Sequence, residues 1–199
     1  MWTVQEETLS ETLKQKLEET GKRIGDTPLL RVRKLFEKKS VQIYAKAEWE
    51  QLSGSVKARA AYYIFREAIK SGKLDEGKIL LDATSGNTGI AYAAIGKELG
   101  IQVALCLPEN ASKERKQILN KLGAQIIYTS KFGGTDEAQE VAKELAETYP
   151  NRYFYADQYK NEQNWKAHYY GTALEIITAV PNITHFVAGL GTTGTFTGT

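Results

Sequence analysis

The feature that most constrains this chain is a regular alternation of helix-like and strand-like segments that begins at residue 57. Short apolar runs, typical of buried strands, alternate with longer segments whose apolar side chains recur at helical spacing. We expect helices at 57–71, 87–99, 112–122, 135–148 and 162–179, and strands at 78–82, 101–106, 125–128, 153–156 and 184–188. This alternation predicts an α/β fold built on a mostly parallel sheet.

The segment before residue 57 has a different pattern. A leucine recurs at every fourth position from Leu9 to Leu17 within a predicted helix at 4–20, and Gly21 provides a stop. The apolar stripe is narrow, so we expect this helix to dock on the body of the protein or on a second subunit. Two short strands are predicted after it, at 29–32 and 41–45.

Composition excludes several classes of protein. The net charge is only +2, which gives no reason to expect nucleic acid or an anionic membrane surface as a partner. Apolar runs are too short to span a membrane, and the acidic N-terminus lacks the features of a secretory signal. Cys106 is the only cysteine, so no intrachain disulfide and no multi-cysteine metal site can form. We expect a cytoplasmic protein without a metal.

Two loops rich in small polar residues follow predicted strands, where ligands bind in open α/β sheets. The first, Thr84 to Gly89, reads Thr-Ser-Gly-Asn-Thr-Gly and opens a predicted helix. Backbone N–H groups at a helix N-terminus, joined by hydroxyl and amide donors, suit a carboxylate or a phosphate. A helix cap needs only one such residue, so the pattern favours an anion site over a simple cap.

The second loop runs from Gly189 to Thr195, directly after the strand expected at 184–188. Its glycines and threonines also suit an oxyanion. It matches the G-x-G-x-x-G pattern of dinucleotide-binding proteins as well, but that fingerprint needs an acidic residue about 20 positions downstream. The sequence stops at Thr199, so a dinucleotide-binding protein stays open as an alternative.

Lys57 lies where a glycine turn enters a mostly apolar helix. Spacing alone favours an ordinary solvated lysine. Burial near the two loops would lower the pKa of its amine and make it a usable nucleophile and base. A phosphate loop, a carboxylate loop and an activated lysine are the parts that a pyridoxal-phosphate enzyme needs for an amino acid.

Five motifs occur in a fixed order along the chain: Ile24 to Leu29, Gly54 to Lys57, Thr84 to Gly89, Gln158 to Asn161 followed by Ala167 to Tyr169, and Gly191 to Thr195. In this order they resemble the motifs of the cysteine synthase and cystathionine β-synthase family, which are pyridoxal-phosphate enzymes. The resemblance implies fold type II, similar to tryptophan synthase β: two open, mostly parallel twisted sheets with flanking helices.

The resemblance also implies roles for individual residues. Lys57 would carry pyridoxal 5'-phosphate as a Schiff base and later remove the Cα proton, and Asn87 would hydrogen-bond the phenolic oxygen of the cofactor. The substrate carboxylate would be bound by Thr84, Ser85, Thr88 and Gln158. The phosphate would be bound by Gly191, Thr192, Thr193, Gly194 and Thr195.

The implied activity is β-replacement. An O-activated serine, with O-acetylserine as the first choice, and sulfide would give cysteine through an aminoacrylate intermediate. The resemblance also implies a homodimer, in which the N-terminal helix is a candidate contact. Three alternatives stay open: a catalytically impaired or truncated binding module that kept the fold, a serine or threonine dehydratase, and a cystathionine β-synthase-like enzyme.

Several positions depart from the family pattern. Ala58 stands where the family usually has an acid, and Thr193 where it usually has glycine. Family members also continue well past the phosphate loop, so we expect the larger domain to be incomplete here. The expected division is 1–50 for an N-terminal part of the larger domain, 51–151 for a smaller α/β domain, and 152–199 for the start of the rest of the larger domain.

Overall fold

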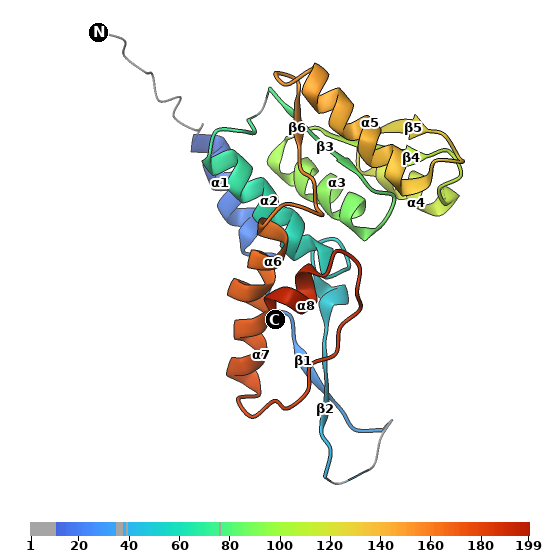
Figure 1. Ribbon diagram of the computed structural model, residues 1–199. Coiled ribbons are helices and arrows are strands. Elements are labelled where there is room, and N and C mark those ends of the chain that lie inside the picture. Colours follow the sequence, from blue (N-terminus) through green and yellow to red (C-terminus); the bar gives the residue numbers. More distant parts are fainter. Residues whose placement is uncertain (1–10, 35–37, 39, 76) are drawn as a thin grey trace.

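The larger sheet of the computed structural model is parallel and has four strands; the structure describes residues 11–34, 38, 40–75 and 77–199 (Figure 1). The strand order is β5-β4-β3-β6. The four strands are β3 (Ile79–Ala83), β4 (Val103–Pro108), β5 (Gln125–Thr129) and β6 (Tyr153–Tyr155). Each lies within two residues of its predicted bounds, so the α/β fold with a parallel sheet is confirmed.

Helices cover both faces of this sheet, as the apolar sequences of its central strands require. Leu80 and Leu105 point to one face, where they pack with apolar residues of α2 (Lys57–Lys70) and α3 (Asn87–Leu99). Leu81 and Cys106 point to the other face and pack with alanines of α5 (Gly134–Thr148). Because neighbouring residues of a strand face opposite ways, a strand buried on both faces must be apolar throughout. Helix α4 (Lys113–Lys121) lies beside α3 and β5.

The N-terminal helix α1 (Glu11–Gly21) packs on the same body, against α3. Leu13 and Leu17 are buried, and the Tyr62 hydroxyl donates to the carbonyl of Leu17 at 3.1 Å. The predicted leucine stripe therefore docks within this chain. The part of the predicted helix that includes Leu9 lies outside the described residues.

A second, smaller sheet lies on the other side of the molecule (Figure 1). Its strands β1 (Leu29–Val32) and β2 (Ile43–Lys46) form an antiparallel ribbon in which Leu29 faces Lys46. The short 3-10 helix η1 (Glu48–Glu50) follows and leads to α2. Both predicted strands are confirmed, but in the described residues the second sheet consists of this antiparallel pair.

The C-terminal part is mostly helical. It comprises α6 (Gln163–Ala167), the π-helical segment η2 (His168–Ala173), α7 (Leu174–Ala179) and α8 (Gly194–Gly198). The first three form the continuous helix predicted at 162–179, with a π-helical stretch in its middle. Strand β6, which pairs with β3, extends the four-stranded sheet beyond the domain boundary expected at residue 151.

The strand predicted at 184–188 is wrong. Residues 183–190 run without regular structure, and Val187 in their middle is 91% exposed. A strand needs a neighbour to bind its backbone N–H and C=O groups. No described strand pairs with this segment, so its β-branched residues do not form a strand although they favour one. In the described part of the chain, no helix is long and apolar enough to cross a bilayer.

Candidate active site

Lys57 is the first residue of α2 and follows a turn in which Gly54 has a φ of 72°. The side chain is half-buried, and burial lowers the pKa of its amine. No carboxylate of the described residues forms an ion pair with it. The hydroxyls of Ser53 and Ser55, just before it, are buried and have no hydrogen-bond partner among the described residues. Unpaired buried hydroxyls beside a desolvated amine fit a polar group that the protein binds here.

Ala58, where the family pattern has an acid, is fully buried. A carboxylate at this position would lose its hydration, which is costly without a partner. The alanine therefore fits its apolar surroundings.

Arg59 holds this end of α2 in place through a buried cluster of charges. Its guanidinium is 2% exposed and donates to Glu48 at 2.8 Å and to Glu175 at 2.6 and 2.7 Å. Lys46 pairs with Glu175 at 2.5 Å, and Glu48 accepts from the Thr27 hydroxyl at 2.6 Å. The cluster thus joins the β2 ribbon, α2 and α7, two residues away from Lys57.

The pKa values of these carboxyls follow from their partners. Burial alone would raise the pKa of Glu175, but hydrogen bonds from Arg59 and Lys46 hold it at about 2. Burial also opposes the charged form of Glu48, and hydrogen bonds from Arg59 and Thr27 more than offset it, so that its pKa is lowered. Both carboxyls are therefore ionised at neutral pH.

The loop from Thr84 to Gly89 lies between β3 and α3, where the sequence places it. Helix α3 begins at Asn87, whose side chain is exposed, after Gly86 in an extended conformation. A Cβ on Gly89 would lie 2.9 Å from the carbonyl oxygen of Thr84, so glycine permits the close turn. The arrangement leaves the first backbone N–H groups of a 13-residue helix at the end of a parallel strand, which suits an anion.

Thr88 and Gln158 meet across 70 residues of sequence. The buried hydroxyl of Thr88 donates to the Gln158 Oε1 atom at 2.7 Å. The backbone N–H of Gln158 donates to Asp82 at 3.3 Å, and Asp82 also accepts from the backbone of Ala83 at 2.7 Å. With its oxygen engaged by Thr88, the amide of Gln158 keeps its NH₂ group for a ligand.

Asn164 connects this group to the second loop. Its Nδ2 atom donates to the carbonyl of Gln158 at 2.8 Å and to the Thr192 hydroxyl at 2.8 Å. A Cβ on Gly194 would lie 2.2 Å from the Asn164 side-chain oxygen, so glycine is needed for this contact. The structure therefore brings Thr88, Gln158 and Thr192 into one chain of hydrogen bonds.

The second loop leads into α8 and lines a pocket of about 160 Å³ together with Tyr159, Lys160, Asn161, Glu162, Asn164 and Trp165. Gly191 is exposed, and Thr193 has a φ of 64°, a conformation that favours glycine. This is the position where the family pattern has glycine. The Thr195 hydroxyl lies 3.2 Å from Nε2 of the buried His168.

His168 connects Lys57 to this loop: its ring contacts Thr195, and it lies close enough to Lys57 for the charge of the lysine to affect its pKa. Burial, followed by the positive charges of Arg59 and Lys57, lowers the pKa of His168 to about 4. Helix α6 contacts both α2 and α8, and α2 also contacts α3 (Figure 1). The lysine and both loops are thus carried by elements that touch one another. The hydroxyls, the amide and the half-buried amine fit a phosphorylated aldehyde cofactor with an amino-acid carboxylate.

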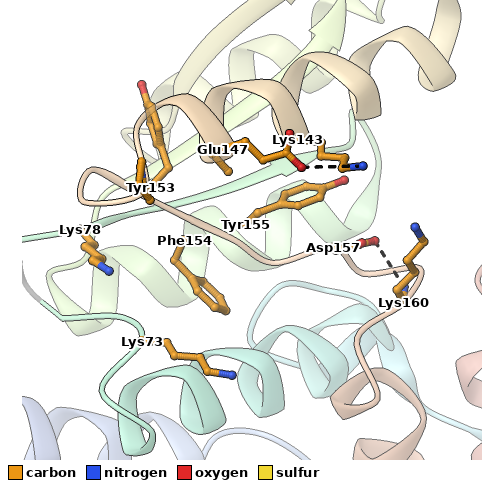
Figure 2. Close-up of a pocket in the computed structure, with 11 residues that line it drawn as sticks. Lys73, Lys78, Lys143, Glu147, Tyr153, Phe154, Tyr155, Asp157 and Lys160 are labelled. Carbon is orange, nitrogen blue, oxygen red and sulfur yellow. Dashed lines mark hydrogen bonds and ion pairs between the residues drawn. The ribbon is translucent and has the colours of Figure 1, made fainter.

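A larger pocket, of about 410 Å³, shares Lys160 with the pocket beside the second loop (Figure 2). It borders β6 and α5, where Phe154 and Tyr155 point in different directions and Lys73, Lys78 and Lys160 lie at the margin. None of the predicted site residues lines it. The predicted site therefore does not coincide with this pocket.

Sequence reasoning missed Asp82 and Asn164. A signal existed for Asp82, because it is the one charged residue in an otherwise apolar strand directly before the first loop. No comparable signal marks Asn164, since its role depends on two contacts that are distant in sequence. Among the residues described, no group of three or more His, Cys, Asp or Glu side chains could hold a metal ion.

The fold and the two loops define an α/β enzyme of fold type II. The chain belongs to the family described as "Pyridoxal-phosphate dependent enzyme", which matches residues 21–199. It is 46% identical to a cysteine synthase from Aquifex aeolicus, over all of this chain and 62% of that protein. It is 40% identical to cysteine synthase B from Salmonella typhimurium, over 88% of this chain and 57% of that protein.

The solved structures agree with this assignment. The crystal structure of a hydrogen sulfide-producing enzyme from Fusobacterium nucleatum matches with a TM-score of 0.85 and 38% identity, over 93% of this chain and 57% of that chain. The resemblance to cysteine synthases is therefore confirmed. The chain spans about three fifths of the length of these relatives.

Proposed function

We propose that this chain carries the cofactor and substrate site of a cysteine synthase-like β-replacement enzyme. The observation that supports it most is the chain of hydrogen bonds from Thr88 through Gln158 and Asn164 to Thr192, which joins the two anion loops. Two anion sites held at a fixed separation suit a ligand with a carboxylate at one end and a phosphate at the other. O-acetylserine and sulfide are the proposed substrates, and cysteine the product.

When bound, pyridoxal phosphate supplies an electron sink for chemistry at the Cα of an amino acid. Lys57 is the proposed attachment point, because burial lowers the pKa of its amine and so raises the share of the neutral, nucleophilic form. Its Nζ atom would then take the proton from the substrate Cα. Asn87 would hydrogen-bond the ring oxygen, since its exposed side chain stands at the start of α3.

Thr84, Ser85 and Gln158 are proposed to bind the substrate carboxylate. Gln158 would donate through its NH₂ group, because its oxygen accepts from Thr88. Thr88 would contribute to substrate binding mainly by orienting the side chain of Gln158. Gly191, Thr192, Thr193, Gly194 and Thr195 are proposed to hold the phosphate with backbone and hydroxyl donors. We also propose a homodimer, as the family resemblance implies.

The first experiment is titration of the purified chain with pyridoxal phosphate, followed by visible absorption. A band of protein-bound cofactor that disappears in Lys57→Ala supports the assignment. Lys70→Ala is a matched control, because Lys70 is an exposed lysine of the same helix. A native chain that gains no such band would contradict the proposal. Formation of cysteine from O-acetylserine and sulfide then tests the reaction, and pyruvate release without cysteine would favour an eliminating enzyme instead.

A further inference from the structure

A row of three side chains runs from helix η2 to helix α8. The Nδ1 atom of His168 lies 3.0 Å from the Thr172 hydroxyl, and its Nε2 atom lies 3.2 Å from the Thr195 hydroxyl. We propose that His168 is a positioning residue that keeps the Thr195 hydroxyl as a hydrogen-bond donor to the phosphate of pyridoxal phosphate. This inference rests on the proposed function, because that function is what brings a phosphate to Thr195.

Counting protons restricts the two hydrogen bonds of the His168 ring to two arrangements. A neutral imidazole has one N–H and one lone pair, so one of its two hydroxyl partners must donate and the other must accept. A threonine in a helix often donates to a carbonyl one turn earlier. Within the described residues, no carbonyl accepts from the Thr172 hydroxyl, and His168 is its hydrogen-bond partner. The two hydroxyls differ in their surroundings: Thr172 is 3% exposed and has only the ring to accept its proton, whereas Thr195 is half-buried in the loop proposed to hold the phosphate. Both hydroxyls are satisfied in the presence of an anion only when Thr172 donates to Nδ1 and Nε2 carries the N–H.

This tautomer of His168 determines where the hydroxyl proton of Thr195 can point. Its oxygen accepts from Nε2–H of His168, so its own proton cannot be directed at the ring. Among the described residues no other side chain or carbonyl takes that proton. An anion bound to this loop would be the acceptor, and the hydroxyl would meet it with a fixed donor. With the opposite tautomer, Thr195 would donate to the ring and present only lone pairs to the anion, which is unfavourable.

Burial and charge keep the ring neutral, as this arrangement requires. His168 is 1% exposed, and the groups that affect its titration are Arg59 and Lys57, which oppose protonation, and Glu48, which favours it. Burial and the two cations outweigh the effect of Glu48, so the pKa of His168 is lowered to about 4. A protonated ring would donate from both nitrogens and would disrupt the bond from Thr172.

Close packing prevents the ring from shifting away. A Cβ on Gly198 would lie 2.3 Å from the carbonyl oxygen of Trp165 and 2.8 Å from Cβ of His168. Helix α8 can approach α6 and η2 this closely only because residue 198 is glycine. The distance between His168 and Thr195 is thus set by backbone contact and does not depend on a flexible side chain.

The test uses the chain labelled with ¹⁵N at histidine, which is practical because the sequence contains only two histidines. Two-bond ¹H–¹⁵N correlations at neutral pH identify the protonated nitrogen of each ring. We expect His168 to carry its proton on Nε2 with and without ligand. Thr172→Val removes the donor to Nδ1, and we expect this variant to show a mixture of tautomers. The exposed His185 serves as an internal reference.

The second readout compares pyridoxal phosphate with pyridoxal, which lacks the phosphate. Thr195→Val should weaken binding of pyridoxal phosphate by about tenfold or more, the usual effect of losing a hydrogen bond to a charged group, and leave pyridoxal binding unchanged. His168→Leu should reproduce this selective loss. His168→Gln, whose side-chain NH₂ can still donate, should restore most of the affinity.

Two outcomes would overturn the inference while the proposed function stands: His168 protonated on Nδ1 in the native chain, or a Thr195→Val variant that binds both probes as the native chain does. Both are read on the native fold or on a mild variant, so misfolding of His168→Leu would not decide the matter. A native chain that binds no pyridoxal phosphate contradicts the proposed function itself, and the role of Thr195 as a phosphate donor falls with it.

Discussion

Replacement of Arg59 by methionine should be among the most damaging single changes in this chain. The guanidinium is almost fully buried and makes five hydrogen bonds, four of them to the carboxylates of Glu48 and Glu175. Removing one partner of a buried ion pair costs about 3–5 kcal/mol, because the remaining charge is left without compensation. Glu175 keeps Lys46 and Glu48 keeps Thr27, so we expect a loss near the lower figure, about 3 kcal/mol.

Urea denaturation followed by circular dichroism at pH 7 measures this change in the free energy of unfolding. Lys70→Met on the same helix is the matched control, and we expect it to change stability by less than about 0.5 kcal/mol. Arg59→Lys keeps the charge but loses the planar fork, so its effect should lie between the two. A loss below about 1 kcal/mol in Arg59→Met would show that the cluster is solvated and would refute this reasoning.

Four further predictions follow from single features. The free energy of unfolding should fall as the pH drops from about 6.5 to about 4, because the unfolded chain protonates His168 in that range and the folded chain does not. His168→Gln should flatten this part of a curve of stability against pH. Below pH 4.5 stability should fall further as the unfolded chain protonates Glu175, whose folded pKa is about 2, and Glu175→Gln should remove this acid-dependent step. Thr193→Gly should raise the melting temperature, since it relieves a left-handed conformation that costs about 1 kcal/mol. Gly194→Ala should weaken pyridoxal phosphate binding in a spectroscopic titration, because a methyl group at this position would displace Asn164. An unchanged affinity would argue against the contact between Asn164 and Thr192.

Sequence patterns predicted the secondary structure well where it depends on local periodicity. Helix α3 has its predicted bounds, because the polar loop opens it and Gly100, with a φ of 76°, ends it. Strand β3 was equally predictable, since all five of its residues are buried and four of them are apolar. The strand expected at 184–188 failed because a strand also needs a partner, and pairing is not encoded in the segment itself.

The sequence predicts a site at Lys57 and both loops, but it does not predict the contacts that hold them in place. Arg59 and Glu175 are 116 positions apart, and no spacing rule relates them. Asn164 connects the loops only after α6 has folded back onto α2 and α8. The π-helical segment was also beyond prediction, because its sequence reads as an ordinary helix. Such features depend on tertiary contacts, so local patterns cannot reveal them.

The way the chain distributes charge gives a physical reason for the chemistry proposed for Lys57. The cluster around Arg59 contains two cations and two carboxylates, so it stabilises the start of α2 without adding net charge beside the lysine. The contacts between the two loops are made by neutral hydroxyls and amides. An unpaired carboxylate beside the lysine or between the loops would raise the pKa of Lys57 and compete with an anionic ligand. The paired carboxylates of the cluster and the neutral donors between the loops avoid both effects, which suits the reactive amine and the anion-binding loops that we propose.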